Sequence, residues 1–468
     1  MKIITFENGS ARKIDVETGP SYFLDTNIYI APFSDEQTLV IDSWNDTIDL
    51  VSRDNIDPVS RICKIANRYF PRTNDPSGEL FSISKRCEEE ERMRGINVIS
   101  LCPTFSCNLA CTYCFERAFD LKEPMPNKED YASMIKEAER FLQKAKKCYP
   151  DNPSVIELFG GEPLQRKTRS FVSNVLSLAR TNKVGISIVT NGYDLISFLD
   201  LLVLYRDVLK SVSLTLDGIK PIHNATRLTR NGKGSFDKIV ESVDAMVDLG
   251  LPIRICTNVS KSSLDALDRL IEFVINKQWP SSPYFQMEIG RVYDRYATNN
   301  NDIVFESAIQ HKLMELFANG KPSWLISGFM KSTEYPSKLL GIDFGQNEYG
   351  KSRFRYCWAT SNIIRGYYLG PDMQRYRCTT TVGNNHYRLS PGPGHIPLDT
   401  EAEWLDTAKK TKCTKCPIGG YCNGGCRIEN RYKHRTEICN YELDNFRFFV
   451  SENAIPTVKK ILAKGCEA

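Results

Sequence analysis

Between residues 96 and 293, short apolar runs rich in β-formers alternate with segments of helical periodicity. The runs that we expect to be strands are 96–103, 154–161, 184–192, 211–218, 252–260 and 283–292. Helical patterns lie between them, for example over 130–147 and 235–250. Such alternation predicts right-handed βαβ units and a parallel sheet, either open or curled into a barrel. The expected fold class is therefore α/β, with ligands at the carboxyl ends of the strands.

The segments before and after this region have other patterns. Residues 1–95 contain strand-like runs at 2–7 and 21–34 and then helical stretches at 58–70 and 84–95, which predict a small α+β unit. After residue 293 come a polar loop and a helix over 305–320, and from about 350 the chain is loop-rich, with a Pro/Gly break at 390–399. We expect five parts: an α+β unit at 1–95, the sheet domain at 96–295, a helical linker at 296–349, a cysteine-rich domain at 350–445 and a C-terminal helix at 446–468.

Composition excludes several classes of protein. The chain has 468 residues, 41% of them hydrophobic and 25% charged, and no apolar run approaches the roughly 20 residues of a membrane span. The N-terminus lacks the apolar stretch and cleavage site of a secretion signal, so we expect a cytoplasmic protein with no membrane partner. The net charge of +4 arises from interspersed residues and gives no reason to expect a nucleic acid partner.

The 16 cysteines are better explained by metal ligation than by disulfides, because reducing compartments keep thiols free. Ten of them fall into a tight triplet and a C-terminal set. The triplet, Cys107, Cys111 and Cys114, has the spacing C-x3-C-x2-C in a loop after the first expected strand. A closed zinc site or an ordinary [4Fe-4S] cluster normally has four ligands. Three thiolates would leave one iron of a cluster open, whereas a zinc knuckle would borrow its fourth ligand from elsewhere.

The stretch "CNLACTYCF", with Tyr113 before the last cysteine, resembles the signature of the radical S-adenosylmethionine (radical SAM) superfamily. The resemblance covers roughly residues 97–440. It implies a partial (β/α)6 barrel and a [4Fe-4S] cluster whose open iron chelates the methionine moiety of SAM. It also implies that an electron from the cluster splits SAM into methionine and a 5′-deoxyadenosyl radical, which abstracts a substrate hydrogen.

Three later segments also resemble family motifs. "ELFGGEPL" looks like the GGEP motif, in which Gly160 and Gly161 permit close backbone approach, Pro163 fixes the turn and Glu162 offers a carboxylate to an ammonium group. Asn191, Thr215 and Asp217 follow the next strands and are candidates for contact with the ribose or methionine end of SAM. Ordinary turn chemistry also explains the Gly-Gly, Asn-Gly and Asp-Gly pairs.

The C-terminal cysteines are too numerous for one site. The spacing C-x2-C-x5-C-x3-C begins at residue 413, and a further cysteine follows it and two precede it. The set resembles the SPASM domain, which carries two auxiliary [4Fe-4S] clusters and would bring the total to three clusters. The resemblance assigns one cluster to Cys413, Cys416, Cys422 and Cys439. It assigns the other to Cys357, Cys378 and Cys426, which is one ligand short. Zinc ribbons are the alternative, because C-x2-C pairs are common zinc ligands.

The resemblance also suggests the substrate. Relatives that act on ribosomally made peptides often carry an N-terminal winged-helix-like unit that binds the leader peptide as an added strand, and residues 1–95 are a candidate for such a unit. A cap that covers the barrel is the alternative. In sulfatase-maturing relatives an aspartate follows the second cysteine of the auxiliary set, where this chain has Thr379.

We therefore expect a radical SAM/SPASM enzyme. Its expected reaction forms a thioether or carbon-carbon cross-link in a ribosomally synthesised precursor peptide, with electrons from a donor such as flavodoxin or ferredoxin. The alternatives are maturation of a protein substrate, as in sulfatase activation or quinone-cofactor biogenesis, and a multi-zinc binding module that is not an enzyme.

Overall fold

A computed structural model describes residues 1–24, 26–70, 95–118, 126–297, 301–328, 332–342, 366–390 and 413–465, together with Cys357 and isolated positions between 78 and 89. The expected helix at 84–95 and the break at 390–399 lie largely outside these residues. Within the described residues, no helix combines the length and apolar character that crossing a bilayer requires.

The central domain is a nine-stranded sheet with the order β14-β13-β12-β11-β10-β9-β8-β15-β16. Its middle six strands are parallel and follow the chain in order. They are β8 (Asn97–Leu101), β9 (Ser154–Leu158), β10 (Gly185–Thr190), β11 (Leu209–Thr215), β12 (Ile253–Val259) and β13 (Phe285–Arg291). The expected α/β class and parallel sheet are confirmed.

Two later segments extend this sheet at its edges. Strand β14 (Leu325–Ser327) pairs in parallel with β13, and β15 (Gly366–Leu369) pairs in parallel with β8. Strand β16 (Arg375–Tyr376) then pairs antiparallel with β15. The segment expected to be a helical linker therefore also supplies a strand, and the cysteine-rich segment closes the other edge.

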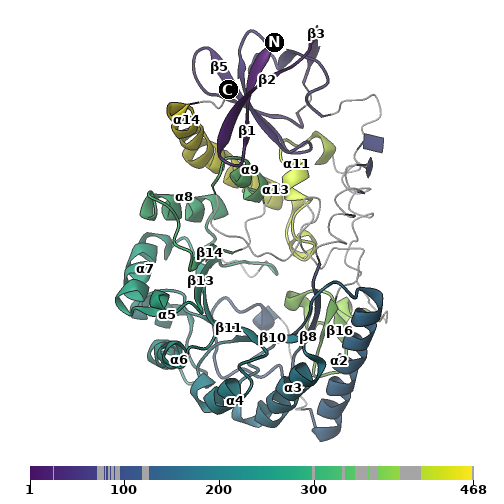
Figure 1. The fold of residues 1–468 in the computed structure, drawn as a ribbon, viewed down its shortest axis with the longest axis vertical. Helices are drawn as coiled ribbons and strands as arrows, with labels where there is room; N and C mark the ends of the chain where they lie inside the picture. The colour runs from purple at the N-terminus through teal and green to yellow at the C-terminus, as the bar shows by residue number, and fades with distance from the viewer. Residues whose placement is uncertain are drawn as a thin grey trace.

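Helices cover the outer face of the curved sheet, as Figure 1 shows. They are α2 (Lys128–Cys148), α3 (Arg169–Asn182), α4 (Leu199–Leu204), α5 (Lys220–Thr226), α6 (Phe236–Asp248) and α7 (Leu267–Asn276). Strand β12 shows why: Ile253 and Ile255 are buried, whereas Arg254 and Cys256 between them are only partly buried. Alternate side chains point to opposite faces of a strand, so one face packs against helices and the other lines a polar interior.

The N-terminal unit is richer in strands than expected. Five strands form an antiparallel sheet in the order β2-β1-β6-β5-β4, and β3 (Thr18–Phe23) pairs with β7 (Ile62–Ile65) beside it. The five are β1 (Lys2–Glu7), β2 (Ser10–Asp15), β4 (Tyr29–Pro32), β5 (Gln37–Asp42) and β6 (Thr47–Ser52).

The prediction of a helix at 58–70 is wrong, because β7 lies there. Its apolar residues have nearly helical spacing, but Cys63 and Ile65 are buried in a core beneath the sheet and alternate with exposed Lys64. The described residues 1–70 accordingly form a strand-rich unit, and the winged-helix-like arrangement over 1–95 stays a prediction, because most of residues 71–94 lie outside the described part of the chain. Isolated positions between 78 and 89 are helical.

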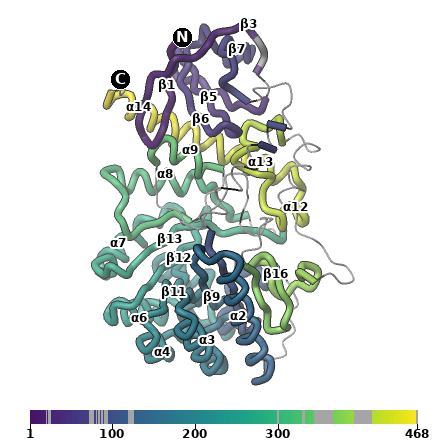
Figure 2. The backbone as a smooth tube through the Cα atoms, turned by 45° about the vertical axis from the view of Figure 1, so that its right-hand side comes forward, coloured from purple at the N-terminus to yellow at the C-terminus, as the bar shows by residue number. Residues whose placement is uncertain are grey.

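The two ends of the chain pack together. The N-terminal sheet contacts α9 (Glu334–Leu339) and α14 (Ile455–Lys464), and it lies at the opposite end of the molecule from the barrel helices (Figures 1 and 2). Helix α13 (Arg435–Phe448) continues through a π-helical turn at Phe449–Ala454 into α14 and contacts α8 (Glu306–Leu316). Short helices α11 (Gly419–Cys422) and α12 (Glu429–Tyr432) precede it.

Candidate active site

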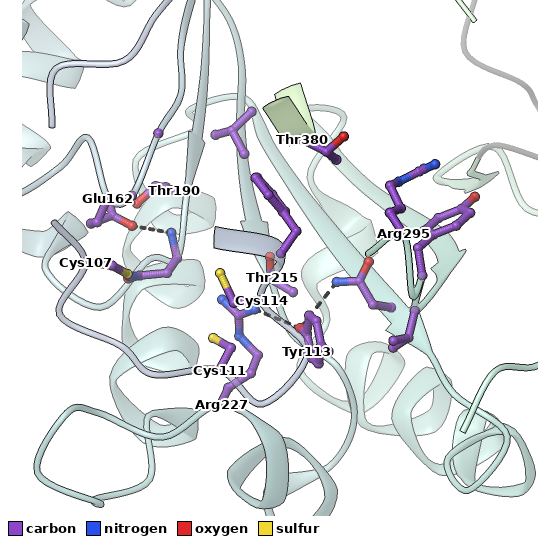
Figure 3. A pocket seen from close by; sticks show the side chains of 18 of the residues that line it. Cys107, Cys111, Tyr113, Cys114, Glu162, Thr190, Thr215, Arg227, Arg295 and Thr380 are labelled. Carbon is purple, nitrogen blue, oxygen red and sulfur yellow. Dashed lines mark hydrogen bonds between the residues drawn. The ribbon is translucent and has the colours of Figure 1, made fainter. Parts of the chain in front are cut away.

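A cavity of about 340 Å³ opens at the carboxyl ends of the parallel strands (Figure 3). All three cysteines of the triplet line it. So do six of the other predicted residues: Tyr113, Gly160, Gly161, Glu162, Asn191 and Thr215. Segments more than a hundred residues apart in the sequence meet here because parallel strands end at one edge.

The triplet loop follows β8 and is held from the side by the segment after α5. The amides of Ala110 and Thr112 donate to the carbonyls of Leu228 and Thr226, at 2.7 and 2.9 Å. Nε of Arg230 donates to the Cys107 carbonyl at 2.6 Å. A loop with few internal hydrogen bonds is thereby fixed by neighbours, which presents the three thiols to one space.

The thiols are in a buried environment. Burial is the main cause that raises the pKa of Cys107 and of Cys114 to about 12, with Glu162 and Glu116 as the next causes. Burial likewise raises the pKa of Cys111. A bound metal would supply the positive charge that favours the thiolate form of these groups.

The arrangement of the thiols fits a cluster better than a single ion. A zinc ion needs its sulfur ligands within about 2.3 Å of one point. In the described part of the chain no three His, Cys, Asp or Glu side chains converge in this way, yet the three thiols share one cavity. Each thiolate of a cluster binds a different iron, so spread ligands around a cavity suit that group.

Gly160 and Gly161 pack directly against the strand that leads to the triplet. Gly160 has φ of +144°, and a Cβ there would lie 2.4 Å from Sγ of Cys102. A Cβ on Gly161 would lie 2.4 Å from the carbonyl oxygen of Phe105. Both positions therefore require glycine, and the close approach that the sequence predicted is made to the chain itself. Pro163 is buried behind the turn and does not line the cavity.

The Glu162 carboxylate is buried and already accepts three hydrogen bonds. Its donors are the Leu164 amide at 2.8 Å, the Thr190 hydroxyl at 2.5 Å and the Asn191 amide at 2.6 Å. Burial raises its pKa to about 7 in spite of these donors. Two oxygens offer about four lone-pair sites, so the carboxylate retains capacity for one further donor from the cavity.

Asn191 connects the third strand to the triplet. Its side-chain Nδ2 lies 3.4 Å from Sγ of Cys107 and donates to Oδ1 of Asn108 at 2.7 Å. The sequence suggested contact with SAM at this position. In the structure the side chain also contacts a sulfur of the triplet.

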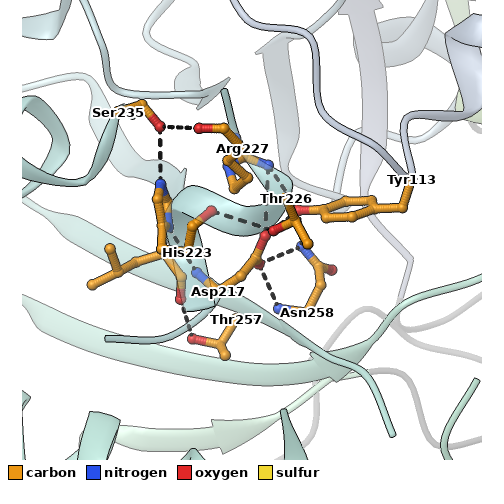
Figure 4. Close-up of polar contacts among 9 residues, drawn as sticks. Tyr113, Asp217, His223, Thr226, Arg227, Ser235, Thr257 and Asn258 are labelled. Carbon is orange, nitrogen blue, oxygen red and sulfur yellow. Dashed lines mark hydrogen bonds and ion pairs between the residues drawn. The ribbon is translucent and has the colours of Figure 1, made fainter. Parts of the chain in front are cut away.

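Asp217 does not line the first cavity but belongs to a buried network behind Tyr113 (Figure 4). The Tyr113 hydroxyl donates to the Asp217 carboxylate and accepts from Nη1 of Arg227 at 2.9 Å. The amide of Asn258 donates to Oδ1 of Asp217 at 2.9 Å. Arg227 and Asn258 both line the cavity, and the sequence analysis missed them. The position of Asn258 in β12 at the same sheet edge was a usable signal.

A second cavity of about 330 Å³ lies on the other side of this network. It shares Tyr113, Asn258 and Val292 with the first cavity and reaches Asp217. Its remaining wall carries hydroxyl and carboxylate groups, including three serines and Asp302. The Tyr113 side chain therefore belongs to the walls of both cavities.

The far wall of the first cavity comes from segments that the sequence analysis did not single out. Arg291, Tyr293 and Arg295 follow or end β13, and Thr380 comes from the cysteine-rich segment. Nε of Arg291 donates to Glu306 at 2.9 Å, and its guanidinium carbon lies 3.9 Å from the centroid of the Tyr293 ring. No short motif marks these residues in the sequence.

The C-terminal cysteines gather in two places. Burial and then Glu442 raise the pKa of Cys422, and the neighbouring thiols of Cys416, Cys413 and Cys439 raise it further. Elsewhere, burial and then Cys357 raise the pKa of Cys378, and Cys378 in turn perturbs Cys426. The structure thus brings together the four cysteines of one expected set and, separately, the three of the other. Their role as ligands stays a prediction.

Residues 101–274 match the family model described as the radical SAM superfamily. These residues are a radical SAM domain, and the chain is an enzyme. The expectation of a non-enzymatic zinc module is set aside. The family implies a [4Fe-4S] cluster and SAM as its cofactors.

Relatives extend the similarity beyond this domain. The chain is 24% identical over 382 residues to a cysteine-type anaerobic sulfatase-maturating enzyme of Clostridium novyi. The aligned residues cover 77% of this chain and 96% of the relative. It is 29% identical over 186 residues to a probable GTP 3′,8-cyclase of Methanocella arvoryzae. The aligned residues cover 39% of this chain and 55% of that protein.

Solved structures share the fold. Native anSMEcpe with bound AdoMet has a TM-score of 0.55 at 20% identity, over 78% of this chain and 99% of that one. SuiB of Streptococcus suis, bound to its precursor peptide SuiA, has a TM-score of 0.50 at 14% identity, over 88% of this chain and 97% of that one. The chain therefore has the fold of SPASM-type radical SAM maturases.

Proposed function

We propose that this enzyme modifies a ribosomally synthesised peptide, forming a thioether or carbon-carbon cross-link after hydrogen abstraction. The observation that carries the proposal is the single cavity lined by the triplet thiols, by the glycine pair and Glu162, and on its far wall by Thr380 from the cysteine-rich segment. A space bounded by both cysteine-containing segments suits a substrate held between a SAM-bound cluster and an auxiliary cluster.

The chain's own residues have distinct parts in this proposal. Cys107, Cys111 and Cys114 would hold the [4Fe-4S] cluster, and Glu162 would accept a hydrogen bond from the ammonium group of SAM. When bound, this pair supplies the 5′-deoxyadenosyl radical. Asn191 orients the Cys107 sulfur, and Tyr113 separates the two cavities and anchors the loop through Asp217 and Arg227.

Two auxiliary clusters complete the proposal and bring the total to three. Cys413, Cys416, Cys422 and Cys439 would hold one of them. Cys357, Cys378 and Cys426 would hold the other, with the last ligand supplied by another residue or by substrate. The grouping of these thiols in two places supports this assignment. A flavodoxin or ferredoxin would supply low-potential electrons.

The substrate assignment has support from neighbours with the same fold. One anSMEcpe structure holds a Cp18Cys peptide and one SuiB structure holds the precursor peptide SuiA. In the present chain we assign leader binding to residues 1–95, whose antiparallel sheet ends in β2 and β4. A strand at the end of a sheet presents unpaired backbone groups to an extended peptide.

A second candidate function is maturation of a protein substrate, as in sulfatase activation. The similarity to a sulfatase-maturating enzyme over 96% of that protein's length favours it. Thr379 stands where such relatives carry an aspartate, which argues for the first candidate.

The metal content tests the cofactor assignment. Anaerobically reconstituted wild type should contain about twelve irons, and a Cys107/Cys111/Cys114→Ala variant about eight, at about four per cluster. SAM cleavage should be absent in the variant. Stoichiometric zinc with little iron in the wild type would overturn the proposal.

The substrate is tested by reductive SAM cleavage in the presence of candidate peptides. A precursor peptide with a leader should stimulate cleavage and gain a cross-link that mass spectrometry detects as the loss of two hydrogens. If only a leaderless sulfatase-type peptide with cysteine or serine is oxidised, the second candidate is correct.

A further inference from the structure

Arg295 bridges the candidate active site and one of the two C-terminal cysteine sets. It follows β13, and its side chain lines the cavity that contains the triplet (Figure 3). Its Nη1 donates to Sγ of Cys426 at 3.1 Å. The guanidinium carbon lies 4.1 Å from the centroid of the Tyr293 ring, which fixes the plane of the group.

A second residue of the same wall leads to the same set. Thr380 lines the cavity, and its Oγ1 lies 3.2 Å from Sγ of Cys378. Its carbonyl accepts a hydrogen bond from the Tyr296 hydroxyl at 2.5 Å, so the backbone here is held in place. Arg295 and Thr380 therefore form the partition between the cavity and the set of Cys357, Cys378 and Cys426.

The other cysteine set has an arginine of its own, which provides a comparison. Nη2 of Arg435, at the start of α13, donates to Sγ of Cys413 at 2.9 Å. Arg435 does not line the cavity among the described residues. Among the described residues an arginine thus donates to a sulfur of each set, but of these two arginines only Arg295 belongs to the wall of the active site.

A guanidinium beside a cluster ligand acts on the cluster in a known direction. Reduction adds negative charge, and a fixed positive charge with a hydrogen bond to sulfur stabilises that charge. The effect is large because the site is buried and weakly screened. Loss of the arginine should therefore lower the reduction potential of the cluster.

We propose that Arg295 is a positioning residue that raises the reduction potential of the auxiliary cluster on Cys357, Cys378 and Cys426 and couples this cluster to the substrate cavity. The proposal rests on the auxiliary clusters of the proposed function.

The test is a redox titration of the full-length chain by electron paramagnetic resonance. A Cys107/Cys111/Cys114→Ala background leaves only the auxiliary clusters, so two midpoint potentials are expected. Arg295→Leu should lower one of them, and the matched Arg435→Leu should lower the other. Arg295→Lys, which keeps the charge but not the planar fork, should give a smaller shift.

Iron analysis separates the possible outcomes. Fewer than about eight irons in the background protein would overturn the auxiliary clusters themselves. If Arg295→Leu keeps its full iron content and both potentials are unchanged, only the role of Arg295 is overturned. The same holds if Arg295→Leu and Arg435→Leu shift the same potential. If Arg295→Leu and the milder Arg295→Gln both lose about four irons, Arg295 is needed to assemble the site and does not merely set its potential.

Discussion

Gly161 lies in the loop after β9 and brings the backbone of this loop against the residues that precede the triplet. A Cβ at this position would lie 2.4 Å from the Phe105 carbonyl oxygen and 2.6 Å from that of Ser106. Cys107 is the next residue. The absence of a side chain at Gly161 therefore determines where the first thiol of the triplet lies, and the residue acts through the backbone.

We expect Gly161→Ala to displace the triplet loop and to weaken SAM binding at least about tenfold, which corresponds to about 1.4 kcal/mol. Equilibrium binding of SAM to the reconstituted protein measures this change. Gly290→Ala is the control, because the nearest atom to a Cβ at Gly290 is the Thr257 carbonyl oxygen at 4.0 Å. Equal SAM affinities in the two variants would contradict the argument.

His223 is a buried histidine that the structure keeps neutral. Its Nδ1 accepts from the Asp217 amide at 3.2 Å, and its Nε2 lies 3.0 Å from Oγ of Ser235 (Figure 4). That hydroxyl donates to the Arg227 carbonyl, so Nε2 carries the proton. Burial, and then the charge of Arg227, lower the pKa of His223 to about 3.

The pH dependence of stability follows from this shift. In the unfolded chain histidine binds a proton below about pH 6.5, whereas the folded chain takes it up only near pH 3. Stability should therefore fall as pH falls below 6.5, by about 1.4 kcal/mol per pH unit from this group. His223→Gln should remove about 1.4 kcal/mol of the loss between pH 7.5 and 5.5, measured by urea unfolding.

At the scale of elements, the triplet loop is held by segments from the part of the sheet beyond β9 and β10. The loop after β11, the end of α5 and strand β12 supply Asp217, Arg227 and Asn258, and all three meet at the Tyr113 hydroxyl. The ion pair between Arg227 and Asp217, at 3.9 Å, is almost fully buried. A buried network of this kind is stable only while each member keeps its partners.

Tyr113→Phe tests this network, because it removes one hydroxyl and leaves the ring. We expect a loss of about 1–3 kcal/mol in the free energy of unfolding, since Asp217 and Arg227 remain buried with a missing partner. Iron at the triplet should fall as the loop loosens, while iron at the C-terminal sets should not. The control is Tyr284→Phe, since that side chain is 56% exposed. Similar stability of both variants would refute the role of the network.

At the scale of the whole molecule, the N-terminal unit is joined to the C-terminal cysteine set. The turn between β5 and β6 packs on the loop between Cys416 and Cys422: Oγ of Ser43 accepts from the Gly420 amide at 3.2 Å, and the Tyr421 hydroxyl donates to Asp46 at 3.0 Å. A Cβ on Gly420 would lie 2.2 Å from the Ser43 carbonyl oxygen. The unit therefore supports the loop that carries two of these cysteines.

We expect Gly420→Ala to separate the turn at residues 43–46 from residues 419–421 and to release about four irons from the set of Cys413. The Ser43 backbone cannot move aside, because it is held between two strands of the N-terminal sheet. SAM binding at the distant triplet should be retained. Iron content and SAM affinity, measured on the same reconstituted sample, check both statements. An unchanged iron content would show that the N-terminal unit does not support the cluster loop.

Local patterns in the sequence were sufficient to predict the parallel sheet and the edge at which its ligands gather. Period-two and helical repeats act within one element, so the six parallel strands β8–β13 and helices such as α2 and α6 were predictable. Cys107, Cys111 and Cys114 lie in a single loop, so their spacing could also be interpreted from the sequence. The same local logic misassigned residues 62–65, because Ile62 and Ile65 suit a helix by spacing while Cys63 and Ile65 bury against a sheet.

Contacts between distant segments were decided only by the tertiary structure. Arg227, Arg295 and Thr380 join the active-site wall from segments far apart in the sequence, and their meeting depends on how the strands and the cysteine-rich segment close around one cavity. The docking of residues 43–46 on residues 419–421 spans more than 370 positions. Sequence determines such contacts only through the packing of the whole chain, since each is a choice among many possible loop closures. The cysteine spacing was therefore sufficient to predict the chemistry. The residues that surround the cysteines, such as Arg295, could be identified only from the fold.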